Sequence, residues 1–338
     1  MIEFRKYLNG DENSILELYQ KVFNLDLSYD NWNWKYNGLD PNSKIIFLAF
    51  DKDKCIGHYA LIPYKLNGMG ESIDALVSLD SMVDPDYQGR QVFSRLVDFA
   101  FKNIGNMNKP YFTFLNENSV KVYTKKFNWK YLGNVPIYIR PLSLNRFKNK
   151  YNILYKILKP ISWLINSSIK KDKDIVFKSI NTFSNDLDGL FKQEDYFSTS
   201  RNKFFLEWRY NSSSNEYEKY NILYMGEIIG ICIVRDESKF GINFIWIMDL
   251  VLKNNNLDQY QAVLNALAYR FSKKADFIVS LLPGRKYAKY YLFARYFKLP
   301  SYFLPHKFYF CVNKNMYKKD KINNLENWYM TWSLNDVL

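Results

Sequence analysis

The chain has 338 residues and a net charge of +13, and 48% of its residues are apolar. This length suits one large domain or two ordinary ones, and the apolar content excludes global disorder. The three cysteines are widely spaced and form no CxxC pair, which argues against a disulfide framework and against a zinc site.

The ends of the chain and its charge suggest where the protein works. The N-terminal residues lack the apolar region of a signal peptide, and no run of about 18 uncharged apolar residues occurs, so we expect a cytoplasmic protein. The positive charge favours polyanions, anionic lipids or phosphorylated ligands as partners, unless it only reflects abundant lysine. No nucleic-acid-binding motif accompanies the charge, so we expect no DNA partner.

The first 142 residues alternate between strand and helix patterns. After an initial strand, the predicted elements in chain order are helices at 12–23 and 29–36, strands at 43–51, 57–66 and 73–83, a helix at 92–103, a strand at 111–115, a helix at 119–126 and a strand at 131–137. This order predicts an α/β fold with a mixed, mainly antiparallel sheet and a late strand–helix–strand unit.

Landmarks of this first region recur in the second half of the chain. The matched positions are Trp34 and Trp208, Gly57 and Gly230, Asp80 and Asp249, Tyr123 and Tyr291, and Trp129 and Phe297. Their separations are 174, 173, 169, 168 and 168 residues. A nearly constant separation over ordered landmarks indicates two copies of one α/β domain in tandem.

The repeat divides the chain into a first domain at 1–142, a linker at 143–175, a second domain at 176–315 and a tail at 316–338. Residues 141–174 carry eight lysines and arginines against two aspartates, and their apolar residues fall on one helical face that Pro160 interrupts. This basic helix either packs across the domain junction or, through 146–171, lies on an anionic membrane. Trp328 and Trp332 in the tail predict that it docks on the body.

The stretch "SLDSMVDPDYQGRQVFSRL" at 78–96 has the pattern of a strand, a tight turn and a helix. A turn whose backbone N–H groups converge at a helix N-terminus binds diphosphate, and Arg90 would add a positive charge nearby. The alternative is a turn that only caps the helix.

This stretch resembles the GNAT superfamily of acyl-CoA-dependent N-acyltransferases. The family has Gln/Arg-x-x-Gly-x-Gly/Ala between a strand and a helix, and this chain has Gln-Gly-Arg-Gln-Val-Phe at 88–93. Gln91 stands where glycine is usual, so it must adopt a positive φ or reshape the turn, and Phe93 brings bulk beside the diphosphate. A second family feature, an asparagine seven residues before a tyrosine, is present as Asn116 and Tyr123.

The resemblance, which covers about residues 44–133, implies a pair of tandem GNAT-like domains with acetyl-CoA as co-substrate and no metal. In it, the strand at 78–83 splays from its neighbour and its backbone holds the pantetheine arm. The residues that it assigns to the coenzyme are Ser81, Met82, Val83, Gln88, Gly89, Arg90, Gln91, Val92, Phe93 and Asn116.

The implied chemistry is direct attack of an amine on the thioester, which needs a base for the amine and an acid for the leaving thiolate. Tyr123 is the candidate acid, because its hydroxyl carries a proton at neutral pH. Asp80 is a candidate base or ammonium ligand, with a pKa that partial burial would raise. His58 is the alternative base, and the choice between the two stays open.

The second copy lacks the diphosphate turn, since "LVLKNNNLDQYQAVL" has no glycine near the helix start. We therefore expect it to complete an acceptor cleft at the domain junction, with an amine of a small molecule or amino sugar as acceptor. Two alternatives remain. One is a Fem-like transferase that takes its acyl group from aminoacyl-tRNA, which the positive charge would suit, and the other is a non-catalytic binding module.

Overall fold

The computed structural model describes residues 1–40, 44–104, 109–143, 171–185, 196–211, 216–253, 256–300, 307–313 and 320–334, together with residues 156, 169 and 302. Within this part of the chain, the strands form two mixed sheets, one of eight strands and one of seven. The expected α/β fold class is confirmed. Of the predicted linker, the basic segment 146–171 lies outside the described residues apart from residues 156, 169 and 171.

The first sheet is built mainly from the first half of the chain. Its strands in spatial order are β1 (Ile2–Lys6), β2 (Ile45–Asp51), β3 (Lys54–Gly68), β4 (Glu71–Val83), β5 (Tyr111–Leu115), β15 (Tyr309–Asn313) and β6 (Trp129–Asn134), with β9 (Ser198–Thr199) beside β3. One apolar core packs α1 (Glu12–Phe23) and α2 (Tyr29–Asn37) against one face of this sheet. A separate core packs α3 (Val92–Asn103) and α4 (Glu117–Lys126) against the other face.

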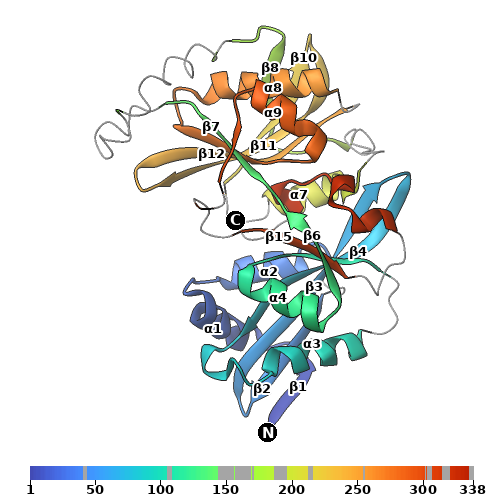
Figure 1. Cartoon of the computed structure of the whole chain (residues 1–338). Helices are drawn as coiled ribbons and strands as arrows, with labels where there is room; N and C mark the ends of the chain where they lie inside the picture. Colours follow the sequence, from blue (N-terminus) through green and yellow to red (C-terminus); the bar gives the residue numbers. More distant parts are fainter. Residues whose placement is uncertain are drawn as a thin grey trace.

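The second sheet repeats this plan. Its strands in spatial order are β14 (Phe297–Lys298), β7 (Ile137–Pro141), β13 (Phe277–Leu281), β12 (Ile242–Leu252), β11 (Glu227–Lys239), β10 (Glu218–Tyr224) and β8 (Ile175–Ser179). Helices α8 (Leu257–Phe271) and α9 (Ala288–Phe293) lie against it, and α7 (Lys203–Asn211) lies between the two sheets (Figure 1). In each sheet one neighbouring pair is parallel, β4 with β5 and β12 with β13.

The two halves exchange one strand each. β7 leaves the first half and pairs with β13 and β14, while β15 comes from the second half and pairs with β5 and β6 (Figure 1). The sequence-based prediction of a single strand at 131–137 is therefore wrong, because β6 ends at Asn134 and β7 begins at Ile137 in the other sheet. Pro136 lies at the crossing, where a residue without an N–H cannot continue a ladder.

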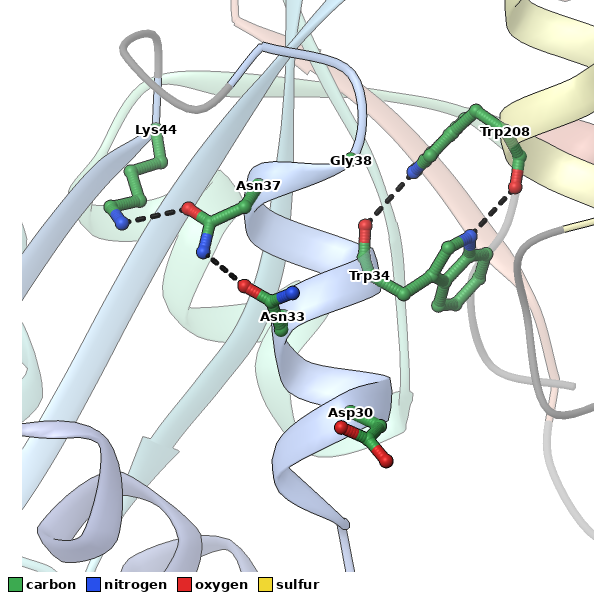
Figure 2. Close-up of a pocket in the computed structure, with 7 residues that line it drawn as sticks. All are labelled: Asp30, Asn33, Trp34, Asn37, Gly38, Lys44 and Trp208. Carbon is green, nitrogen blue, oxygen red and sulfur yellow. Dashed lines mark hydrogen bonds between the residues drawn. The ribbon is translucent and has the colours of Figure 1, made fainter.

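The matched tryptophans of the repeat meet where the halves join. The Trp34 indole N–H donates to the Trp208 carbonyl at 2.7 Å, and the Trp208 indole N–H donates to the Trp34 carbonyl at 2.9 Å. Both hydrogen bonds are drawn in Figure 2. The rings stack with centroids 5.5 Å apart. A Cβ on Gly38 would lie 2.3 Å from the Trp208 ring, so only glycine permits this approach. The reciprocal contact has the form of a two-fold interface within one chain.

The C-terminal segment is part of the packed body. Trp328 and Trp332 are both buried, and the backbone N–H of Tyr329 donates to the Phe197 carbonyl at 2.8 Å. Among the described residues, no helix combines the length and apolar character needed to cross a membrane.

Candidate active site

Strand β4 separates from β5 in the middle of the first sheet. Their ladder contains only the pairs Leu76–Tyr111 and Val77–Phe112, and the Thr113 hydroxyl donates to the Ser78 carbonyl at 2.8 Å where the strands diverge. The rest of β4, as far as Val83, forms no ladder with β5. This is the splayed strand that the resemblance implies.

A β-bulge lies in the splayed part of β4. The register between β3 and β4 shifts between His58 and Ala60, and Asp80 has a positive φ of 43°. A bulge redirects side chains at the point where it occurs. Here Asp80 contacts side chains of α2, whereas the next residue, Ser81, contacts Tyr123 of α4. The bulge thus presents one residue to each face of the sheet.

On the α4 face, Tyr123 is buried against the splayed strand. Its hydroxyl lies 2.7 Å from the Ser81 Oγ and 3.2 Å from the Ser78 Oγ. Burial raises the pKa of Tyr123 to about 12, although both serine hydroxyls act in the opposite direction. The phenol therefore keeps its proton at neutral pH and can donate it.

On the α2 face, Asp80 is held by two neighbouring residues. The Lys35 Nζ lies 3.0 and 3.2 Å from its two carboxylate oxygens, and the Tyr36 hydroxyl donates to it at 2.6 Å. Burial acts to raise the pKa of Asp80, but the Lys35 charge and the Tyr36 hydrogen bond outweigh it, so this pKa lies below its ordinary value. The expectation of a raised pKa is wrong, because the sequence did not reveal Lys35 as a partner.

His58 lies beside this ion pair and is completely buried. Its Nδ1 is 2.8 Å from the Asp80 carbonyl oxygen, and its ring meets Tyr36 edge-on. Because a carbonyl oxygen can only accept, Nδ1 carries the proton in the neutral ring and Nε2 holds the lone pair. The buried Nε2 has no hydrogen-bond partner, and burial lowers the pKa of His58. His58 is thus an uncharged base.

The turn after β4 has left-handed backbone geometry at two positions. Gly89 has φ 77°, and Gln91 has φ 60° and ψ 13° at the N-cap of α3. Gln91 therefore tolerates the positive φ, and its exposed side chain makes no capping bond. The N–H groups of the first turn of a helix have no partner within that helix, so they are available to an anion.

A buried carboxylate anchors the start of this turn. Asp84 accepts from Lys21 and Lys54, each at 2.7 Å, and from the Asp86 backbone N–H at 3.0 Å. Burial would raise the pKa of Asp84, but these partners together lower it to about 2. The charge network fixes the 3₁₀ helix Pro85–Tyr87 that leads into the turn.

A cavity of about 260 Å³ opens at the turn. The residues that line it are Val83, Tyr87, Gln88, Gly89, Gln91, Val92, Phe93, Ser94, Val122 and Lys126. The Lys126 Nζ donates to the Ser94 hydroxyl at 3.1 Å, which places a positive charge at the cavity wall. Arg90 does not line the cavity, and its guanidinium lies 5.2 Å from the centre of the Tyr87 ring.

Phe93 borders the cavity without filling the turn. Its ring centroid is 5.8 Å from that of Tyr123 and 6.0 Å from that of Phe127. Phe93 therefore lies between the turn and the splayed strand. Of the other residues assigned to the coenzyme, Met82 is buried, and Asn116 caps α4 by accepting from the N–H groups of Asn118 and Ser119.

A second cavity, of about 590 Å³, lies at the junction of the halves. Figure 2 shows its lining residues: Asp30, Asn33, Trp34, Asn37, Gly38, Lys44 and Trp208. It faces the side of α2 opposite to Lys35 and Tyr36, because positions 30, 33, 34 and 37 share one helical face. The thickness of α2 therefore separates this cavity from Asp80.

Comparison with known proteins agrees with this geometry. Residues 3–132 match the family model described as an acetyltransferase (GNAT) domain. Residues 3–132 form a GNAT domain. This region contains the splayed strand, the turn and both groups of polar residues around the bulge, so the chain carries an acyl-CoA-dependent N-acyltransferase domain.

Solved structures extend the likeness of fold across both halves. A probable N-acyltransferase from Enterococcus faecalis superposes with a TM-score of 0.67 at 9% identity, covering 92% of this chain and 72% of its own. A GCN5-related N-acetyltransferase from Anabaena variabilis superposes with a TM-score of 0.65 at 12% identity, covering 92% of this chain and 72% of its own. Saccharomyces cerevisiae N-myristoyltransferase with bound myristoyl-CoA superposes with a TM-score of 0.58 at 9% identity, covering 92% of this chain and 82% of its own. No curated protein sequence matches the chain significantly.

Sequence reasoning missed four polar residues of the GNAT domain: Lys35, Tyr36, Ser78 and Lys126. For Lys126 a signal existed, because it follows the candidate Tyr123 by three residues and both therefore lie near the same face of α4. For Lys35 the signal was its place beside the repeated Trp34. Within the described chain, no three histidine, cysteine or acidic side chains gather as a metal site would require.

Proposed function

We propose that the protein transfers an acetyl group from acetyl-CoA to an amine of a small molecule or amino sugar. The observation that carries the proposal is the uncapped N-terminus of α3, which opens into a cavity with Lys126 at its wall beside the splayed β4. A diphosphate suits converging N–H groups and a lysine, and an extended pantetheine arm suits an unpaired strand edge.

The coenzyme would enter from the α3–α4 side. Its diphosphate would lie on the N–H groups of the turn, close to Lys126, and the arm would pass Phe93 to reach the backbone of Ser81, Met82 and Val83. Phe93 packs on α4 rather than on the turn, and this supports a path between the two. The thioester would then lie at the bulge, with Tyr123 on one face of the sheet and His58 on the other.

Two buried groups suit the proton transfers. The acceptor nitrogen would attack the thioester carbonyl and give its proton to the His58 Nε2, forming the C–N bond. The C–S bond would then break, and the Tyr123 hydroxyl would protonate the leaving thiolate. His58 suits the basic role better than Asp80, because Nε2 has a free lone pair whereas the Asp80 carboxylate is already paired with Lys35.

An amine acceptor fits the electrostatics of the α2 face. Asp80 already binds the ammonium group of Lys35, and its carboxylate would attract a second cation that approaches the bulge. Since Tyr36 covers His58, the acceptor would displace α2 side chains as it binds. A small acceptor would stay on this side of α2, because the junction cavity lies at the opposite face of the helix.

Calorimetry with acetyl-CoA tests the proposal. We expect micromolar binding by the natural protein and a loss of about tenfold or more for Lys126→Glu, which puts a negative charge at the cavity wall. Lys125→Glu makes the same charge change on the adjacent exposed residue and should bind almost normally. Arg90→Glu should lie between the two, because Arg90 is close to the cavity but does not line it.

Two outcomes would contradict the proposal. Absence of heat from the natural protein would remove acetyl-CoA as the donor, and equal losses for Lys125→Glu and Lys126→Glu would remove the turn cavity as its site. If acetyl-CoA gave no heat but tRNA bound with a steep dependence on salt, the aminoacyl-tRNA-dependent alternative would replace the proposal.

A further inference from the structure

A single segment of the second half exposes several large apolar side chains. Leu292 and Phe293 end α9 with 51% and 64% of their surfaces exposed, and Phe297 in β14 is 49% exposed. β14 is an edge strand of the second sheet, paired only with β7 among the described strands. Neighbouring exposed apolar side chains at a sheet edge indicate a contact surface rather than a core.

Positively charged residues flank these apolar residues in the sequence. Lys289 precedes them on α9, Arg295 lies in the turn, and Lys298 follows Phe297 in β14. From residue 277 to residue 319 the sequence has nine lysines and arginines and no aspartate or glutamate. On the adjacent α8 the only acidic residue is Asp258, in the first turn. We call Lys289, Leu292, Phe293, Arg295, Phe297 and Lys298 the α9 surface.

We propose that the α9 surface docks on a membrane that contains anionic lipids. Lysine and arginine attract the lipid phosphates, while leucine and phenylalanine insert among the acyl chains at the interface. A second copy of this chain fits less well, because a two-fold contact would bring two sets of like charges together. RNA would pair with the cations, but an aliphatic leucine offers no ring on which a base stacks.

This inference is independent of the acyl transfer proposed above. The α9 surface belongs to the second half, outside the GNAT domain at 3–132. It also differs from the basic segment at 146–171, for which the sequence alone suggested membrane contact. Docking would hold the enzyme at a surface where a membrane-associated acceptor is concentrated.

Vesicle sedimentation of the full chain tests the proposal. We expect binding to phosphatidylcholine vesicles that contain about a third phosphatidylglycerol, and much weaker binding to phosphatidylcholine alone. Changing Leu292, Phe293 and Phe297 together to serine should reduce binding about tenfold or more with the charge unchanged. The matched apolar control is Phe240→Ser, since Phe240 is 73% exposed beside a lysine at another hairpin and should bind normally.

Two sets of charge-neutralising substitutions distinguish binding through the α9 surface from binding driven by the net charge of the protein. Changing Lys289, Arg295 and Lys298 to glutamine should weaken binding about fivefold per charge. The same change at Lys102, Lys121 and Lys130, which are exposed in the first half, should have a much smaller effect. Equal losses in the two triple variants would overturn the proposal, as would full binding by the serine variant or no binding by the natural protein.

A fluorescence measurement covers the case in which a triple variant misfolds. All three native cysteines are buried, so Phe293→Cys introduces a readily accessible thiol for an environment-sensitive dye. Anionic vesicles should shift its emission to the blue, whereas the dye on Phe240→Cys should not respond. A shift with tRNA in place of vesicles, or a shift at neither position, would overturn membrane docking.

Discussion

Helix α3 follows β4 and helix α8 follows the corresponding strand β12, but the two helices begin differently. At α8, the Asn256 side chain accepts from the N–H groups of Asp258 and Gln259, each at 3.1 Å. At α3, the N-cap residue Gln91 is left-handed and its side chain makes no capping bond. A cap and an anionic ligand compete for the same N–H groups, so only the first half keeps this site available.

The ion pairs of the two halves also differ, because the pair in the first half is less completely buried than the pair in the second half. Arg201 and Asp249 have no exposed side-chain surface, and Arg201 also donates to Thr331, whereas the Lys35 and Asp80 side chains remain 8% and 10% exposed. The second half encloses its repeated aspartate in a structural network. The first half keeps its aspartate at a bulge that solvent can reach.

The largest expected effect on stability comes from a substitution that breaks the buried ion pair of the second half. Asp249→Asn leaves the Arg201 charge buried without its partner and should lower the free energy of unfolding by about 3–5 kcal/mol. Asp80→Asn should lower it less, because Lys35 retains partial contact with water. Urea denaturation measures both. Equal destabilisation by the two variants would show that the aspartates have the same structural role.

The next largest effect distinguishes the matched tyrosines Tyr123 and Tyr291 by their influence on kcat. Tyr123→Phe should lower kcat about 100-fold through loss of the acid, with little change in acetyl-CoA binding. Tyr291→Phe removes a hydroxyl that contacts Ser280 at 2.9 Å in the second half and should leave kcat unchanged. Thiol release from acetyl-CoA with glucosamine as acceptor provides the assay. An unchanged kcat for Tyr123→Phe would remove this residue from the mechanism.

The smallest effect concerns His58, whose counterpart after the repeated glycine is the buried Ile231. Burial lowers the pKa of His58 in the folded state, so the unfolded chain binds the extra proton first as the pH falls. The free energy of unfolding should therefore not depend on His58 titration above about pH 6.5. Below that pH it should decrease by at most about 1.4 kcal/mol per pH unit. In His58→Ile this part of the pH dependence should disappear. A slope that persists would assign it to other groups.

Local patterns were enough to predict much of the first half. The ranges 12–23, 92–103 and 111–115 agree with α1, α3 and β5 to the residue, since apolar periodicity and flanking turn residues mark these elements. The motif at 88–93 predicted that Gln91 either adopts a positive φ or reshapes the turn, and Gln91 has a φ of 60°. The ligand role of the turn stays a prediction.

Pairings between distant residues could not be predicted in the same way. The sequence indicated a charge at the turn from Arg90, which is adjacent in the chain, but the lysine at the cavity wall is Lys126 on another helix. It indicated one strand at 131–137, but that segment crosses between sheets whose other strands lie far along the chain. Asp80 was placed on a splayed strand, but the direction of its pKa depends on Lys35, 45 residues earlier.

The order of residues was sufficient to predict most helices and strands of the first half and to indicate the repeat, because each depends on neighbours within a few positions or on matching of one segment with another. Folding in three dimensions was needed to exchange β7 with β15, to bring Trp34 against Trp208 and to place Tyr123 and His58 on opposite faces of one bulge. Those contacts join residues from distant parts of the chain, and their free energy is gained only when both halves pack together.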